Sequence, residues 1–451
     1  MEQKYVKEAF DTNWVVPLGP NVNGFEKDLE EFVNHAEDDP STLRQVQGPQ
    51  GSGNGASTGS ATAKRVVALS SGTAAVHLGL LAAGVKAGDE VIVQSFTFCA
   101  STHPVTYLGA TPVLVDSEPD TWNIDPELLE EAILDRKAKT GKYPKAIVPV
   151  ALYGMPYKAD RIMEIANKYG IPVVEDAAEG FGSRYKGQML GTFGKYGVLS
   201  FNGNKMITTS GGGALITEGE EHWREIMMYA TQYRESYPYY QHEKIGYNYR
   251  MSNICAGIGR GQMTVVEEHL KHHKHVQKMY EELLADVPGV HVHSQPMVRQ
   301  AHQPSGADPE PVEGAVPELV EGPVYDSNYW LCTITIDPEV KVKGQEDAYK
   351  TIVTGAVGGA AGVIHAAESA HTDCEPNANV EAMRVALDRA QIEARPVWKP
   401  MHKQPCYKDA PAYVNGVSEA IFKIGMCLPA GPYVTDDDVR YIVETIKENI
   451  L

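Results

Sequence analysis

Short apolar runs alternate with helical patterns between residues 66 and 217. The apolar runs predict strands at Val91–Val93, Pro112–Val115, Ala146–Val150 and Pro172–Glu175. Between them, helix-like spacing of apolar residues predicts helices at Thr73–Ala83, Pro126–Ala138 and Lys158–Tyr169. This alternation is typical of βαβ units on a mainly parallel sheet. Because ligands bind such sheets at the carboxyl ends of the strands, the residues that follow each strand are the first candidates for a site.

The second half of the chain has a different, mainly helical pattern. It predicts one or two long helices within Ser252–Leu284, a helix at Val380–Ala390, an extended segment at Glu393–Val397 and a terminal helix that begins at Thr435. Three aspartates follow Thr435, and acidic residues in a first turn suit the helix dipole. We therefore expect a large domain at residues 1–262 and a smaller α+β domain at residues 263–451.

Three stretches break these patterns. Residues 39–62 have the composition of a flexible linker. Residues 297–322 contain the near-repeat PEPVEG and PELVEG. The last part of residues 339–376 is rich in Ala and Gly and has only a weak pattern of apolar and polar positions. We interpret each stretch as an insertion on a surface loop, because loop length costs little stability. The near-repeat is interpreted as spacer, with a docking motif as the alternative.

Charge and composition exclude several classes of protein. The chain has 40 Lys plus Arg against 59 Asp plus Glu, a net charge of -19, which argues against a nucleic-acid partner. The charged start, MEQKYVKEAF, lacks the apolar region of a secretory signal, and no apolar run is long enough for a membrane span. The six cysteines are scattered without a CxxC pair, so neither a zinc site nor a disulfide scaffold is expected. We expect a cytoplasmic protein with no membrane partner.

Candidate chemistry begins with three motifs in the predicted sheet region. Ser70–Ala75 is a small-residue turn that opens a helix, where free N–H groups bind anions. A strand with the apolar pattern of a buried strand ends at Asp176, whose carboxylate could bind a cationic ring nitrogen or a metal ion. Lys205 lies between a strand and the glycine run Gly211–Gly213, and a desolvated lysine can form a Schiff base. Taken singly, these motifs have ordinary alternatives: a helix cap, a solvated turn and a surface lysine.

A fourth motif, Gly246–Ser252, consists of polar and aromatic residues and precedes the predicted long helix. Its ordinary alternative is the start of that helix. In combination the motifs are more specific. A phosphate cradle, then an acid, then a lysine on a βαβ scaffold is what pyridoxal phosphate requires. The phosphate anchors this cofactor, the acid keeps its pyridine nitrogen protonated, and the lysine holds its aldehyde.

Four stretches, SSGTAAVHLGL, VVEDAAEGFGS, SFNGNKMITTSGGG and GYNYRMSN, resemble motifs of the DegT–StrS family of pyridoxal phosphate-dependent sugar aminotransferases. With ARPVWKPMHKQP and NWVVPLGPNV, they are most similar to the branch that aminates C4 of UDP-4-keto-6-deoxy-N-acetylglucosamine. The resemblance implies the fold type I (aspartate aminotransferase-like) architecture, a sugar-nucleotide substrate, glutamate as donor, and a homodimer with shared active sites. It also implies that family members carry a short segment ahead of the position of Met1, so that its absence here either weakens substrate binding or indicates a misassigned start.

Site residues follow from the resemblance position by position. Lys205 matches the lysine that binds the cofactor and shuttles the proton, and Asp176 matches the acid paired with the pyridinium nitrogen. Glu179 falls near the ring hydroxyl, where the family often has His or Gln, and Phe98 falls where an aromatic side chain stacks on the ring. The phosphate would be bound by Gly72, Thr73, Ser200 and, from the neighbouring subunit, Asn248.

Five further residues are candidates for binding the diphosphate, uracil or glutamate carboxylate: Arg250, Arg395, Trp398, Lys399 and His402. For each, a structural ion pair is the alternative. A dehydratase subgroup of the family has His in place of the lysine, so Lys205 argues against that activity. The remaining alternatives are a 3-keto sugar nucleotide as substrate, or a catalytically silent sugar-nucleotide binding protein.

Three histidines have a spacing that could bind a metal ion. His269, His272 and His273 lie at helical i, i+3, i+4 positions. We interpret them as the solvated face of a Lys/His-rich helix and expect no metal site.

Overall fold

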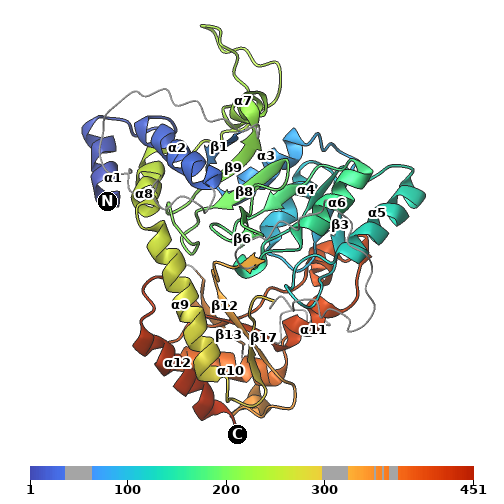
Figure 1. Cartoon of the computed structure of the whole chain (residues 1–451), viewed down its shortest axis with the longest axis vertical. Coiled ribbons are helices and arrows are strands. Elements are labelled where there is room, and N and C mark those ends of the chain that lie inside the picture. The colour runs from blue at the N-terminus through green and yellow to red at the C-terminus, as the bar shows by residue number, and fades with distance from the viewer. Residues whose placement is uncertain (36–62, 297–323, 350–351, 358–359, 365–373) are drawn as a thin grey trace, which may run out of the picture.

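The central layer of the computed structural model (Figure 1) consists of two four-stranded sheets, which the parallel bridges Ile147–Val173 and Val150–Asp176 join edge to edge. The structure describes residues 1–35, 63–296, 324–349, 352–357, 360–364 and 374–451. The strands of the sheet, in spatial order, are β1 (Lys64–Leu69), β9 (Gly213–Glu218), β8 (Tyr196–Ser200), β5 (Val174–Asp176), β4 (Ala146–Val148), β2 (Glu90–Gln94), β3 (Thr111–Val115) and β16 (Ala412–Tyr413). This order places the carboxyl ends of β5 and β8 side by side in the middle of the sheet.

Strand direction confirms the mainly parallel sheet expected from the sequence. Strand β9 runs antiparallel to both of its neighbours, whereas the other pairs in this sheet run parallel. The last residue of β5 is joined to the segment that follows β4, because the Ala151 N–H donates to the Asp176 carbonyl at 3.0 Å and the Asp176 N–H donates to the Pro149 carbonyl at 2.9 Å.

Both faces of this sheet are buried, which explains the continuous apolar runs of its strands. In β2, Ile92 belongs to one hydrophobic cluster, whereas Val91 and Val93 belong to another. This division follows from the two-residue repeat of a strand. The accompanying helices are α3 (Gly72–Ala82), α4 (His103–Tyr107), α5 (Pro126–Thr140), α6 (Ala159–Tyr169) and α7 (Gly219–Ala230). Their positions confirm the three helices predicted in this region.

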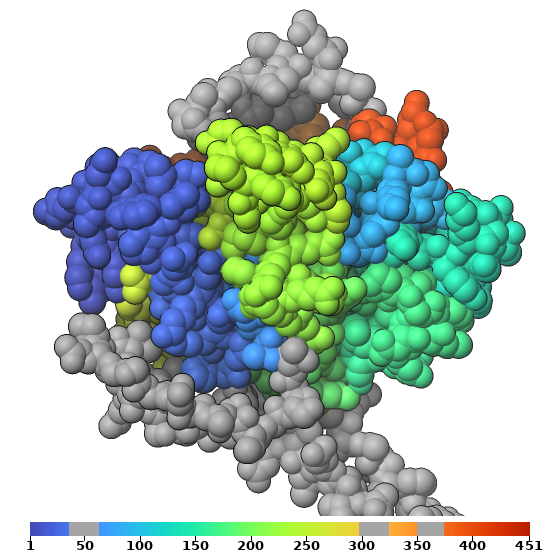
Figure 2. Space-filling model, turned by 90° about the horizontal axis from the view of Figure 1, so that it is seen from above, coloured from blue at the N-terminus to red at the C-terminus, as the bar shows by residue number. Residues whose placement is uncertain are grey.

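Two N-terminal helices were not among the elements expected from the sequence. These are α1 (Glu2–Asp11) and α2 (Pro20–Asn34), and both pack on α8 (Asn253–Met263). The contact is close, because a Cβ on Gly261 would lie 2.5 Å from the backbone nitrogen of Glu2. Figure 2 shows the segment around α7, in yellow-green, between the blue N-terminal helices and the blue-to-green helices of the sheet region.

The lower part of the molecule in Figure 1 is built on a second, antiparallel sheet. Its strands, in spatial order, are β10 (Val290–Val292), β12 (Cys332–Ile336), β17 (Gly425–Leu428) and β15 (Arg395–Pro396). The helices α9 (Val266–Leu284), α10 (Ala378–Arg389) and α12 (Asp436–Asn449) share a hydrophobic core with this sheet. The predicted terminal helix is confirmed, and Thr435 and Asp438 form its capping box. The domain boundary at residue 262 stays a prediction.

The remaining elements are short. A small sheet is formed by β6 (Arg184–Tyr185), β7 (Gln188–Met189) and β11 (Tyr325–Asp326), and α11 (Val417–Ile424) precedes β17. The predicted insertion at 339–376 contains a hairpin of β13 (Ile352–Val357) and β14 (Ala360–Ile364). The predicted insertions at 39–62 and 297–322, with the near-repeat, lie outside the described residues. In the part of the chain that the structure describes, every helix is too short or too polar to cross a bilayer.

Candidate active site

A pocket of about 390 Å³ opens at the carboxyl ends of β5 and β8. It brings together most of the residues predicted for the cofactor, together with one substrate candidate. The predicted residues that line it are Gly72, Thr73, Phe98, Asp176, Glu179, Ser200, Lys205 and Trp398. Segments that are more than 300 residues apart in the sequence therefore meet in one cavity.

The N-terminus of α3 forms one wall of the pocket. Ser71 caps the helix, accepting a hydrogen bond from the Ala74 N–H at 3.0 Å. The N–H groups of Gly72 and Thr73 belong to the first turn, which has no acceptors within the helix. A Cβ on Gly72 would lie 2.9 Å from the Cβ of Ser200, so only glycine leaves this corner open. A helix N-terminus, a hydroxyl and an open corner fit a phosphate group.

The buried carboxyl group of Asp176 lies at the end of β5. Its oxygens accept hydrogen bonds from the Ser101 hydroxyl at 2.6 Å and from the Ala178 N–H at 3.1 Å. Burial raises the pKa of Asp176, whereas these hydrogen bonds and the charge of Lys205 act in the opposite direction. A cationic ring nitrogen in the pocket would favour the ionised carboxylate, so Asp176 fits a pyridinium partner.

The amine of Lys205 lies beside a second buried carboxyl group. Its Nζ is 3.4 Å from Oε1 of Glu179, while Oε2 of Glu179 accepts the Tyr153 N–H at 2.7 Å. Burial raises the pKa of Glu179, and the Lys205 ammonium counteracts this rise. An amine, two buried carboxyl groups and an anion cradle in one cavity fit the donor set that pyridoxal phosphate needs.

Trp330 also lines this pocket and was missed by the sequence analysis. Its ring centroid lies 3.9 Å from Nζ of Lys205, and its Nε1–H donates to the Asn204 carbonyl at 2.6 Å. Two residues earlier, the Asn328 amide donates to the Glu179 carbonyl at 2.9 Å, which attaches this segment to the large sheet. In the sequence, an apolar residue just before a strand looks like an ordinary residue of the hydrophobic core. The local pattern therefore does not indicate that Trp330 contacts Lys205.

Two aromatic residues lie at the edge of the pocket. Phe98 is 50% exposed, and its ring lies 5.4 Å from the ring of Trp398. The Trp398 backbone N–H donates to the Tyr153 hydroxyl at 2.7 Å. Its indole nitrogen is buried without a hydrogen-bond partner among the described residues. Phe98 thus presents a ring face at the mouth of the pocket, and its stacking role stays a prediction.

The other predicted residues do not line this pocket. Asn248 is exposed and pairs through its backbone with Thr231. The guanidinium of Arg250 forms a buried ion pair with Glu26 and donates to the Ala68 carbonyl at 2.9 Å. Arg250 therefore forms a structural ion pair, which was the alternative to a role in substrate binding.

The last three substrate candidates lie in or shortly after β15. The Nδ1 atom of His402 lies 2.7 Å from the Ser95 hydroxyl. The Lys399 carbonyl accepts a hydrogen bond from the Gln404 amide at 3.3 Å. Arg395 forms an ion pair with Glu393 at 2.6 Å. The substrate roles of all three stay predictions.

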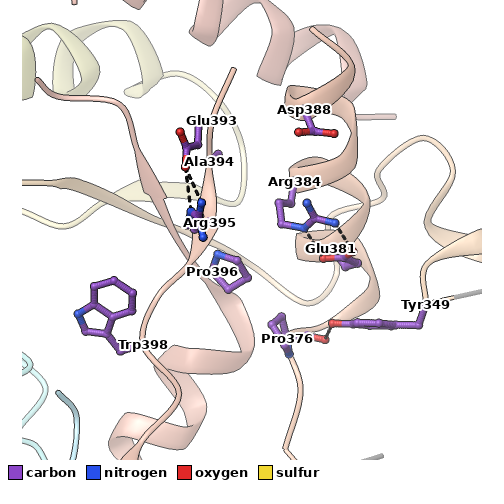
Figure 3. A pocket seen from close by; sticks show the side chains of 10 residues that line it. All are labelled: Tyr349, Pro376, Glu381, Arg384, Asp388, Glu393, Ala394, Arg395, Pro396 and Trp398. Carbon is purple, nitrogen blue, oxygen red and sulfur yellow. Dashed lines mark hydrogen bonds and ion pairs between the residues drawn. The ribbon is translucent and has the colours of Figure 1, made fainter. Parts of the chain in front are cut away.

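Arg395 lines a second pocket, of about 330 Å³, beside α10 (Figure 3). Arg384 and Glu381 form a buried ion pair on α10 at 2.7 Å. Figure 3 shows that pair facing the pocket from α10, with the Arg395–Glu393 pair on the neighbouring segment. Each guanidinium in this pocket already has a carboxylate partner close in sequence.

The solvated-face interpretation of the three histidines was wrong. His273 is only 2% exposed, and its Nδ1–H donates to the Tyr329 carbonyl at 3.0 Å. Burial lowers the pKa of His273 to about 4, so this ring is neutral near pH 7. His269 Nδ1 lies 3.1 Å from the Met206 carbonyl. Among the described residues no cluster of His, Cys, Asp or Glu has the arrangement of a metal site.

Comparisons with known proteins identify relatives along almost the whole chain. The profile of the DegT/DnrJ/EryC1/StrS aminotransferase family matches residues 59–306 and 360–447. The chain is 37% identical over 449 residues to EpsN of Bacillus subtilis (strain 168), a protein named as a pyridoxal phosphate-dependent aminotransferase, with 99% of this chain and 92% of EpsN covered. It is 29% identical over 447 residues to GDP-perosamine synthase of Escherichia coli O157:H7, covering 99% of this chain and 95% of the synthase.

A solved structure has the same fold. It is described as a DegT DnrJ EryC1 StrS aminotransferase from Brucella abortus, and it superposes on this chain with a TM-score of 0.74 at 24% identity. The superposition covers 99% of this chain and 94% of that one.

Proposed function

The chain belongs to the DegT/DnrJ/EryC1/StrS aminotransferase family, and on that premise we propose that it moves the amine of glutamate to the C4 keto carbon of a UDP-4-keto-6-deoxy-N-acetylhexosamine. Pyridoxal phosphate is the proposed cofactor. One observation carries the proposal: the amine of Lys205, the buried carboxyl group of Asp176 and the N-terminus of α3 line a single pocket. The motifs shared with the C4-aminating branch support the choice of sugar.

When bound, pyridoxal phosphate supplies an aldehyde that exchanges amines and a ring that withdraws electrons from the reacting carbon. The residues of the chain bind and orient it. The α3 N-terminus and the Ser200 hydroxyl bind the phosphate, and the Asp176 carboxylate holds the proton on the ring nitrogen. Lys205 would hold the aldehyde carbon, and its amine, once the amine of glutamate has displaced it, would move a proton to and from the substrate carbon.

Aromatic side chains form part of the pocket wall around Lys205. The Trp330 side chain, which is 2% exposed, forms one wall of the pocket. Trp398 contacts Phe98 at the mouth of the pocket. A water-poor pocket strengthens the attraction between the carboxylate of Asp176 and a cationic ring.

The active unit that we propose is a homodimer. Asn248 is exposed and does not line the pocket of its own chain, which leaves it available to the pocket of a second copy. We propose that it binds the phosphate of the neighbouring subunit.

The test is a panel of keto-sugar nucleotides incubated with the purified protein, pyridoxal phosphate and 15N-labelled glutamate. Mass spectrometry of the products is expected to find the label on the C4 amine of a UDP-linked sugar. Label on a 3-amino sugar would replace the proposed substrate and leave the aminotransferase activity standing. Failure to bind pyridoxal phosphate, or to convert glutamate to 2-oxoglutarate with any acceptor, would favour the silent binding protein.

A further inference from the structure

Trp330 makes two contacts with the loop that carries Lys205. Its ring centroid lies 3.9 Å from Nζ of Lys205, a distance at which an aromatic face attracts a cation. Its Nε1–H donates to the carbonyl of Asn204, the residue before Lys205. Because Trp330 is 2% exposed, the attraction acts away from water, where it is strongest. One side chain therefore contacts both the amine and the backbone that positions it.

Helix α9 supports both partners of this contact from behind. His269 bonds the carbonyl of Met206, one residue after Lys205. One turn later, His273 bonds the carbonyl of Tyr329, one residue before Trp330. A single helix thus fixes the spacing between the lysine loop and the tryptophan segment.

The backbone next to Trp330 is held in a conformation that side chains rarely adopt. Tyr329 has a φ of 47°, in the left-handed region, where a bulky residue is strained. Such strain persists only when the surroundings impose it. Here the hydrogen bond from His273 to the Tyr329 carbonyl holds the segment in the position that presents the indole face to the pocket.

We propose that Trp330 is a positioning residue that holds the free amine of Lys205 as an ammonium between its ring face and Glu179. This proposal takes its catalytic meaning from the proposed function, in which Lys205 accepts a proton from the substrate carbon and later returns it. While the proton is on Lys205, the ring face stabilises its charge and keeps the amine in the pocket. The carboxyl groups that face the amine are those of Glu179 and Asp176, and both remain when Trp330 is substituted.

The test measures the charge on this amine in the cofactor-free protein. Acetylation of Lys205 by acetic anhydride is followed by peptide mass spectrometry near pH 7 and near pH 10. The ratio of the two rates reports the uncharged fraction, whereas a change in access multiplies both rates equally. Trp330→Leu is expected to raise this ratio about 3- to 10-fold, because the ring that favours the ammonium is gone. Trp330→Phe, which keeps a ring, is expected to stay within about 2-fold of the unaltered protein.

Trp223 offers a matched control. Its Nε1–H also donates to a backbone carbonyl, that of Val66 at 3.0 Å, and the guanidinium of Arg65 lies 4.6 Å from its ring centroid. Trp223→Leu removes the same kind of contact outside the pocket and is expected to leave the Lys205 ratio unchanged. Trp330→Met is a second ringless variant, with an unbranched and more adaptable side chain, for use if Trp330→Leu unfolds, as judged by circular dichroism.

Two results would overturn the positioning role: an unchanged ratio in the ringless variants, or an equal rise in Trp330→Phe and Trp330→Leu. The measurement needs neither cofactor nor substrate, so its failure is distinct from failure of the proposed function. A protein that bound no pyridoxal phosphate would overturn the proposed function and leave the contact with Lys205 standing.

Discussion

The two pockets are similar in size but differ in where their charged groups come from. In the pocket beside α10, each arginine is paired with a glutamate two or three residues away in the sequence. In the pocket at β5 and β8, Lys205 contacts Glu179, 26 residues away, and Trp330, 125 residues away. Local pairs arise from one helix or strand, whereas distant groups converge only through the fold. Convergence of this kind is the better indicator of a reactive site.

The largest expected effect is the loss of Lys205. Lys205→Ala should lower the rate of amine transfer from glutamate by about 10³-fold or more, because it removes both the bond to the cofactor and the proton carrier. Formation of 2-oxoglutarate measures this rate. Lys168→Ala, in an exposed pair with Glu130, is the control and should keep full activity. Retained turnover in Lys205→Ala would show that this lysine is not the catalytic one.

Asp176→Asn tests the second converging group. Loss of the carboxylate opposite a buried ring cation should slow transfer by about 100-fold. The shape of the side chain is kept, so the protein should remain folded. Steady-state kinetics with saturating cofactor measures the effect. A change of less than about 3-fold would contradict the ion pair with the ring.

Glu381→Gln tests the pocket with local pairs. The buried guanidinium of Arg384 loses one charged partner, which should lower the free energy of unfolding by about 2 kcal/mol. Urea unfolding measures the change, and activity per folded molecule should not change. Glu164→Gln breaks an exposed pair of the same spacing with Arg161 and should cost less than about 0.5 kcal/mol. A large loss of activity in Glu381→Gln would show that the pocket beside α10 also takes part in catalysis, contrary to the difference proposed between the two pockets.

The buried histidine behind the Lys205 pocket predicts a pH dependence of stability. The folded protein lowers the pKa of His273 to about 4 from its ordinary value of 6.5. Stability from this group is therefore complete above pH 6.5 and is lost as the pH falls toward 4, by up to about 1.4 kcal/mol per pH unit. His273→Gln should flatten the loss of stability between these values, as measured by urea unfolding at several pH values. An identical slope would place the titrating group elsewhere.

The smallest effect concerns the phosphate corner. The Cβ of Gly72→Ala would lie 2.9 Å from Ser200, so we expect about 5-fold weaker binding of pyridoxal phosphate, measured by equilibrium dialysis. Gly203→Ala is the matched control, because a Cβ there would have no neighbour within 4 Å. Equal affinity in both variants would show that the corner does not hold the phosphate.

Sequence patterns predicted the parts of the molecule that depend on local repeats. The strands and helices of the central sheet follow two-residue and helical repeats, and Thr435 indicated the start of the last helix. The motifs also predicted that Gly72, Asp176 and Lys205 would meet, because each follows a strand or opens a helix at the same edge of a sheet. These are consequences of neighbouring residues and of parallel topology.

What could not be predicted depends on contacts between distant segments. Trp330 reaches Lys205 only because its segment is attached to the large sheet by Asn328. His273 was misjudged because helical spacing shows which residues share a face, not whether that face is covered. Arg250 lies in a motif of the family, yet its partner, Glu26, comes from a helix that was not expected.

Strand β16 has a consequence for how the chain folds. Its two residues, Ala412 and Tyr413, pair with Leu114 and Val115 of β3, about 300 residues earlier in the chain. During synthesis, β3 is therefore a bare strand edge until nearly the whole polypeptide has left the ribosome. Exposed edges can pair with other chains, so we expect aggregation to compete with folding at this stage.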